Sequence, residues 1–226
     1  MAPDTGQETS RLTTPRAAAI AGVLFAVLMI AALVLIRMSI PTGSSDTGSW
    51  LASNSRTVVI ALNLVPFAGI AFLWFIGVVR DRLGDREDRF FATVFLGSGL
   101  LFLAMLFTSA AVAGGVLVLA ASVSNGLPES NVYSLGRAVT YVVLNTYGMR
   151  MAGVFMISTC TLFLRTKVTP RWMAFLGYIL ALVLLLTLSH YSWVSLLFPL
   201  WVLMISIQIL IENLGRKASS TTFGVG

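Results

Sequence analysis

The chain contains one cysteine and one histidine. Charged residues are also few, at 11% of its 226 positions. A single cysteine, Cys160, excludes an intramolecular disulfide, a two-cysteine redox centre and a four-cysteine zinc site. One histidine excludes bis-histidine haem ligation, and apolar segments without lysine exclude a retinal Schiff base. We therefore expect no cofactor, no metal site and no catalytic residues.

Long apolar segments, by contrast, are abundant, and 57% of the residues are hydrophobic. A bilayer core of about 30 Å requires roughly 20 helical residues, because backbone amides must form their hydrogen bonds within the span. Six segments satisfy this, namely Ala17–Ile40, Thr57–Val79, Phe90–Val123, Ala138–Leu164, Trp172–Ser189 and Trp193–Leu214. The sequence predicts an all-α polytopic membrane protein with six transmembrane helices in one domain, residues 17–214. We expect a disordered cytoplasmic tail at 1–16 and a second cytoplasmic tail at 215–226.

The distribution of Arg and Lys predicts the orientation, because cytoplasmic flanks carry an excess of both. Eleven of the fifteen lie on one side: Arg11, Arg16, Arg80, Arg82, Arg86, Arg89, Arg165, Lys167, Arg171, Arg216 and Lys217. Both termini are therefore expected in the cytoplasm, and the first apolar segment is too long for a cleaved signal peptide. The net charge of +6 is explained by these flanks, so we expect no nucleic-acid partner.

The polar segments between the spans are expected to be connectors. Residues 41–56 and 124–136 should form outer loops, and Gly215 should stop the last helix. The inner segment Arg80–Arg89 alternates four arginines with four acids, which suits either a solvated turn or a docking surface.

The segment Phe90–Val123 is longer than a bilayer requires, since an unbroken helix of this length would extend about 51 Å. We expect one long helix that protrudes on the outer side. The alternative is a break near the small residues of Ala110–Gly115.

Arg150 is the one charge that falls in the middle of an expected span. It lies thirteen residues after Arg137 and fifteen before Arg165, so roughly 20 Å of helix separates it from either end. A central arginine costs about 2.5 to 3.5 kcal/mol on insertion scales. The acidic residue nearest to a span interior is Glu212, at the cytoplasmic end of the sixth segment, and the other eight lie outside the six segments. Neutral acceptors, water, a bound anion or a carboxylate of another chain must therefore satisfy the guanidinium.

Five polar residues are candidates for a ligand site in the outer half: Asn63, Asn145, Tyr147, Arg150 and His190. Together they could line an outward-open cavity with a fixed positive charge at its floor. A guanidinium is a planar, multidentate donor, so an anion or a lipid headgroup is the expected ligand. Alternatively, Arg150 bonds carbonyls and hydroxyls of adjacent helices, the two asparagines join helices, and His190 is a surface residue.

An intramembrane serine protease can be tested on the residues, since Gly97-Ser98-Gly99 and a histidine occur in a six-span chain. Ser98 is about eight residues from the cytoplasmic start of its segment, whereas His190 is expected at the outer end of another. These depths exclude the hydrogen bond that a nucleophile and its base require.

Three blocks of the sequence carry a resemblance: TPRAAAIAGVLF, VVRDRLGDREDRFFATVFLGSGLLF and LNTYGMRMAGVFMISTCTLFLRTKVTPRWMAFLGY. They are similar to uncharacterised multi-pass integral membrane proteins of actinobacteria, and the resemblance implies a bacterial plasma membrane but no activity. The leading hypothesis is that the protein binds or transports an anionic or amphiphilic small molecule or lipid at Arg150. The main alternative is a non-catalytic accessory or scaffold subunit that contacts a second copy or another membrane protein, and an intramembrane enzyme is a third.

Overall fold

The structure is a computed structural model that describes residues 14–40, 53–83, 89–122, 131–166, 170–186 and 192–222. Within these ranges the long elements are α-helices: α1 (Thr14–Ser39), α3 (Ser55–Leu83), α4 (Arg89–Ser122), α5 (Asn131–Val142), α6 (Met149–Thr166), α7 (Arg171–Leu186) and α8 (Leu197–Thr222). A π-helical segment, η2 (Val143–Gly148), joins α5 to α6, and a 3₁₀ segment, η3 (Ser192–Leu196), precedes α8. The predicted all-α polytopic fold is confirmed.

Five helical stretches are long and apolar enough to cross a membrane, which indicates a multi-pass membrane protein. They are Ala19–Ser39, Ser55–Arg80, Ala92–Ser122, Asn131–Arg165 and Trp193–Ile211. The remaining helix, α7, has 16 residues, or about 24 Å at 1.5 Å per residue. The described residues therefore contain six apolar helical stretches, as predicted, but α7 is shorter than a full span.

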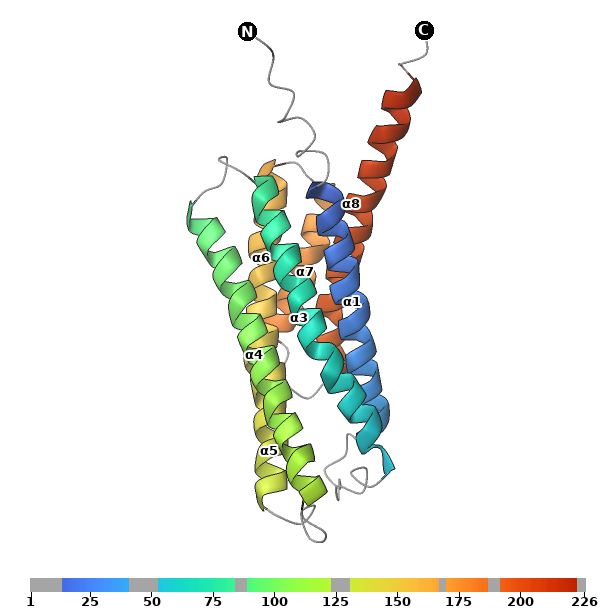
Figure 1. The fold of residues 1–226 in the computed structure, drawn as a ribbon. Coiled ribbons are helices and arrows are strands. Elements are labelled where there is room, and N and C mark those ends of the chain that lie inside the picture. Colours follow the sequence, from blue (N-terminus) through green and yellow to red (C-terminus); the bar gives the residue numbers. More distant parts are fainter. Residues whose placement is uncertain are drawn as a thin grey trace, which may run out of the picture.

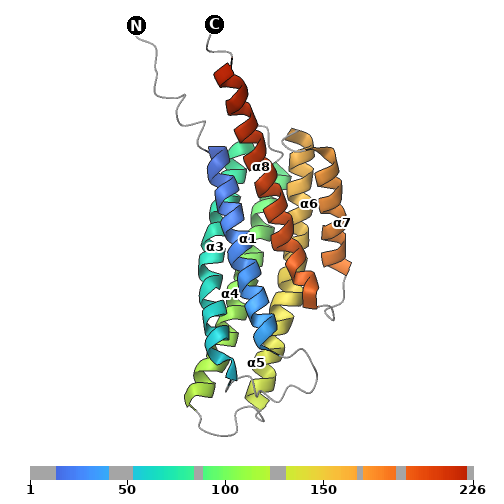
Figure 2. The ribbon, with the colours of Figure 1, turned by 90° about the vertical axis from the view of Figure 1, so that its right-hand side faces the viewer.

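The helices form an elongated bundle whose axes run along one direction (Figure 1). We call the end where α1 begins and α8 ends the inner end, and the opposite end the outer end. At the outer end α4 and α5 extend furthest, whereas α7 and the start of α8 stop well short of it (Figure 2). The outer part of the bundle is consequently built from α1, α3, α4 and α5.

Five phenylalanine rings from five helices form the centre of the core. Phe72 lies 4.6 Å from Phe25, 5.5 Å from Phe102, 5.2 Å from Phe155 and 5.6 Å from Phe198, measured between ring centroids. All five side chains are fully buried. Tilted and edge-to-face pairs of this kind each contribute about 0.5 to 1.5 kcal/mol beyond their burial, so this cluster fixes how α1, α3, α4, α6 and α8 pack.

The long helix predicted from Phe90 to Val123 is confirmed as α4, which is continuous over 34 residues. Its small residues do not break it, because the helix is supported there by α5. Ser109 Oγ of α4 donates a hydrogen bond to the carbonyl oxygen of Thr140 at 2.9 Å.

The outer loop expected at 124–136 is wrong in its second half, because α5 begins at Asn131. Tyr133 is buried and packs in a small outer cluster with Val58 and Leu117. This apolar contact stabilises a first helical turn that the polar composition of the segment conceals.

Three other predicted boundaries also change. The helix α1 begins at Thr14 rather than Ala17, since Thr-Pro is a favoured helix start. The helix α3 continues to Leu83, into the segment expected to be an inner loop. The last helix passes Gly215 and ends at Thr222, because an interior glycine costs only about 1 kcal/mol relative to alanine and does not by itself end a helix.

Candidate functional site

The predicted fourth span is one continuous helical rod made of α5, η2 and α6, and its π-helical part lies beside Arg150. The amide of Met149 donates to the carbonyl oxygen of Leu144, five residues earlier rather than the four of an α-helix. A π-helical turn interrupts the regular ladder of backbone hydrogen bonds, and such turns occur often at functional sites. Here it covers Asn145, Thr146 and Tyr147.

Two side chains donate to backbone carbonyls around this turn. Asn145 Nδ2 lies 3.1 Å from the carbonyl oxygen of Tyr141, and Arg150 Nη1 lies 3.1 Å from that of Thr146. Both bonds connect positions four residues apart in the same rod. Asn145 therefore satisfies its amide within its own helix.

The packing against α4 defines the height of Arg150 in the bundle. A Cβ placed at Gly148 would lie 3.5 Å from Cβ of Met105, and one placed at Gly99 would lie 3.1 Å from Cδ2 of Phe155. Arg150 lies between these two contacts on an antiparallel pair, so it is level with Phe102 and the central phenylalanine cluster.

On α1 that level corresponds to Phe25, which contacts Phe102 at 6.5 Å between ring centroids. Phe25 is nine residues from Arg16 and twelve from Arg37, or about 14 and 18 Å of helix. The arginine is therefore deep in the apolar part of the molecule.

Arg150 belongs to the face of α6 that packs on α7. Along this face Thr161 Oγ1 and Tyr178 Oη share a hydrogen bond of 2.7 Å, and a Cβ at Gly153 would lie 3.2 Å from the carbonyl oxygen of Ala181. Arg150 precedes Gly153 by three residues and shares its side of the helix. The matching position on α7 would fall about one turn beyond Leu185, but α7 ends at Leu186. Arg150 is thus level with the outer end of α7.

The helical stretches around Arg150 that the structure describes carry no acidic side chain. None of the nine Asp and Glu residues falls in α7 or in the five membrane-spanning stretches. Negative potential is available at the C-terminal end of α7, where up to four carbonyls lack helical partners and the helix dipole places about half a negative charge.

Arg150 is partly exposed, and within the described residues its only hydrogen bond is the one to Thr146. A guanidinium has five N–H donors. Most of them therefore have no acceptor in the part of the chain that the structure describes.

The other predicted site residues divide into three cases. Tyr147 is 58% exposed and lies one turn from Arg150 on the same rod, next to Asn145. Asn63 is exposed on α3, nine residues outward of Phe72, so the structure leaves it about 14 Å along the bundle from Arg150. His190 lies outside the described residues.

Ser98, which was considered above as the nucleophile of an intramembrane protease, has a structural role. Ser98 Oγ donates to the carbonyl oxygen of Val94 at 2.6 Å within α4. No cluster of three or more His, Cys, Asp or Glu side chains suited to a metal occurs in the described parts of the chain.

Two features of this site were not predicted, the π-helical turn and the short α7. The π-helical turn has no recognisable sequence pattern in VLNTYG. The early end of α7 does have a sequence signal, since Thr187, Ser189 and His190 interrupt the apolar run. Comparisons with protein-family models, curated proteins and solved structures find no match for this chain, so the resemblance to actinobacterial membrane proteins stays a prediction and function must be argued from the site.

Proposed function

We propose that this protein binds the anionic group of an amphiphilic molecule, a carboxylate or a phosphate, at Arg150 in a bacterial plasma membrane. The observation that carries the proposal is the state of the guanidinium. It lies level with the central phenylalanine cluster and donates a single described hydrogen bond, to Thr146 of its own helix.

A neutral carbonyl does not offset the burial of a full positive charge, because the insertion cost of about 2.5 to 3.5 kcal/mol for a central arginine remains largely uncompensated. Two parallel N–H···O bonds to a carboxylate or phosphate would use the unpaired donors and neutralise the charge together. Arginine suits this better than lysine, since its planar fork matches both anions.

An amphiphile fits the position better than a small inorganic anion. The site lies in the apolar part of the bundle, and beside it Tyr147 presents a half-exposed aromatic ring with a hydroxyl at its tip. A ligand whose charged group reaches Arg150 can keep its hydrocarbon part along exposed apolar side chains.

The competing role for Arg150 is structural. Its positive charge lies level with the carbonyl end of α7, an interaction worth about 0.3 to 2 kcal/mol. Such a role would stabilise the end of a helix that stops at membrane depth, and it would require no ligand.

The test measures ligand-induced thermal stabilisation of purified full-length protein in a neutral detergent. Oleate and lysophosphatidic acid supply the two anions on a lipid, monoolein supplies a neutral lipid, and acetate and inorganic phosphate supply the free anions. We expect both anionic lipids to raise the temperature at the midpoint of unfolding, because a ligand at 100 times its Kd stabilises the folded protein by about 2.7 kcal/mol. Monoolein should not, and an equal effect of the free anions would assign the site to a small solute.

Three variants give the result its meaning. Arg150→Gln should abolish the stabilisation and Arg150→Lys should weaken it, whereas Arg56→Gln, an exposed arginine on α3, should keep it. An Arg150→Gln variant that responds to ligand like the wild type overturns the proposal. If that variant is also less stable without ligand, Arg150 instead stabilises the end of α7, or an assembly with another membrane protein if a partner is lost.

A further inference from the structure

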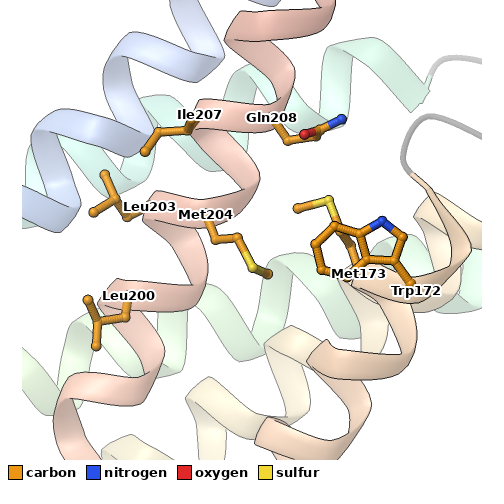
Figure 3. Close-up of a pocket in the computed structure, with 7 residues that line it drawn as sticks. All are labelled: Trp172, Met173, Leu200, Leu203, Met204, Ile207 and Gln208. Atoms are coloured by element: carbon orange, nitrogen blue, oxygen red, sulfur yellow. The ribbon is translucent and has the colours of Figure 1, made fainter.

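A second site is indicated at the inner end of the bundle, where α7 and α8 diverge. A groove of about 360 Å³ lies there, lined by Trp172 and Met173 of α7 and by Leu200, Leu203, Met204, Ile207 and Gln208 of α8. Figure 3 shows Met204 and Gln208 pointing from α8 toward Trp172 and Met173. Its volume lies within the range of about 300 to 1,000 Å³ that small-molecule sites occupy.

The polarity of the groove changes along its length. Gln208 is the lining residue of α8 furthest along the chain, and it points toward the α7 side of the groove (Figure 3). It marks the inner end, as does Trp172, the second residue of α7. The other α8 residues that line the groove, from Ile207 back to Leu200, are apolar. That stretch covers eight residues, or about 12 Å of groove.

The groove opens on the surface of the bundle rather than into its core. Trp172 is 59% exposed, Leu200 48% and Ile207 43%. In a membrane protein such apolar side chains face lipid, so an acyl chain can enter sideways from the bilayer.

The charge at the polar end favours an anionic headgroup. Arg171 is exposed and immediately precedes Trp172 at the start of α7. The N-terminal end of the α7 dipole adds positive potential at the same place. The seven residues that line the groove include no acid. The acid nearest to them in the sequence is Glu212, one turn beyond Gln208 on α8.

We infer that this groove holds one anionic phospholipid of the cytoplasmic leaflet, with an acyl chain between α7 and α8 and the phosphate beside Arg171. A length of apolar wall with a polar, positively charged mouth at the headgroup level matches the two parts of such a lipid. The inference is independent of Arg150, which lies about 20 Å away along α6, level with the opposite end of α7.

The experiment reconstitutes the full chain in vesicles of equal parts dioleoylphosphatidylglycerol and dioleoylphosphatidylcholine, extracts it gently and counts retained lipids by native mass spectrometry. We expect one phosphatidylglycerol retained in preference to phosphatidylcholine. Arg171→Gln should reduce the preference about fivefold, the effect of one basic residue near an anionic surface. Arg80→Gln, an exposed arginine at the same end of the bundle, should leave it unchanged.

The second part of the experiment uses variants with a larger side chain in the groove. Met204→Trp should release the lipid, and Gln208→Trp repeats the test should the first variant fail to fold, because both side chains point from α8 toward α7 (Figure 3). Ile179→Trp places an indole on an exposed position of α7 outside the groove and should retain lipid like the wild type.

Four results would overturn the inference. The first is equal retention of the two lipids by the wild type, and the second is unchanged retention by the folded groove-filled variants. The third is loss of lipid in Arg150→Gln alone, which would assign the bound lipid to the other site. The fourth is a dimer that Met204→Trp or Gln208→Trp converts to a monomer, since it would show that a second copy occupies the groove.

Discussion

Substitution of Gly177 by alanine should destabilise the protein, because three helices meet at this glycine without space for a methyl group. A Cβ at Gly177 would lie 2.7 Å from Nε1 of Trp201 on α8 and would overlap Sγ of Cys160 on α6. Trp201 and Cys160 are each only 1% exposed, so neither can move aside into open space.

The expected magnitude follows from two opposing effects. Overpacking a dense core by one methyl group costs about 1 to 3 kcal/mol, whereas Gly→Ala within a helix gains about 0.5 to 1 kcal/mol. The net destabilisation should be about 1 to 2 kcal/mol. For a chain of this size that corresponds to a fall in Tm of about 2 to 8 °C.

The assay is thermal unfolding in detergent, with Gly77→Ala as the matched control. Gly77 lies in α3 with nothing within 4 Å of its would-be Cβ, so the same substitution there should leave Tm unchanged or raise it slightly. Cys160→Ala should partly rescue Gly177→Ala, since it removes one of the two overlapping atoms. If Gly177→Ala unfolds at the same temperature as the control, the close packing of α6, α7 and α8 described above is wrong.

Three further predictions concern the spans. Thr161→Val should cost about 0.6 kcal/mol, the average for hydrogen bonds between membrane helices, and a double-mutant cycle with Tyr178→Phe should show coupling; additive effects would contradict the 2.7 Å bond between these residues. Cys160, the single cysteine and 1% exposed, should resist a maleimide reagent in the folded protein and react after unfolding; rapid labelling of folded protein would place it at the surface. In a Cys160→Ala background, Arg80→Cys should be protected from an impermeant maleimide in intact cells and Arg56→Cys labelled, as the predicted orientation requires; the reverse pattern would invert the topology.

Hydropathy predicted the long helices well because the requirement behind it is strong and local. A membrane-embedded backbone must satisfy its own hydrogen bonds, so an apolar run such as Phe90–Val123 becomes one helix, here α4. The same requirement explains why Pro66 lies inside α3 without ending it.

Features that depend on contacts between helices were not predictable. The first turn of α5 is stabilised by burial of Tyr133 against α3 and α4, and nothing in a segment rich in polar residues signals those partners. Apolar positions surround most of the spans on all sides, so periodicity does not show which phenylalanines meet at the centre.

The candidate site was predicted in part. The depth and isolation of Arg150 follow from its spacing to Arg137 and Arg165 and from the absence of acids in the spans. The structure keeps Asn145 and Tyr147 within five residues of Arg150 on the same helical rod but separates Asn63, because helix register between different spans is set by packing that the sequence does not display.

The central phenylalanine cluster also limits how a molecule could pass through this protein. Five fully buried rings from α1, α3, α4, α6 and α8 contact one another, with ring centroids 4.6 to 6.5 Å apart. These rings occupy the space between the five helices. A permeation path along that axis would require several of these contacts to separate at once. Exchange of any molecule held by the bundle should therefore proceed laterally, through its lipid-facing sides, and its rate should depend on the fluidity of the surrounding bilayer.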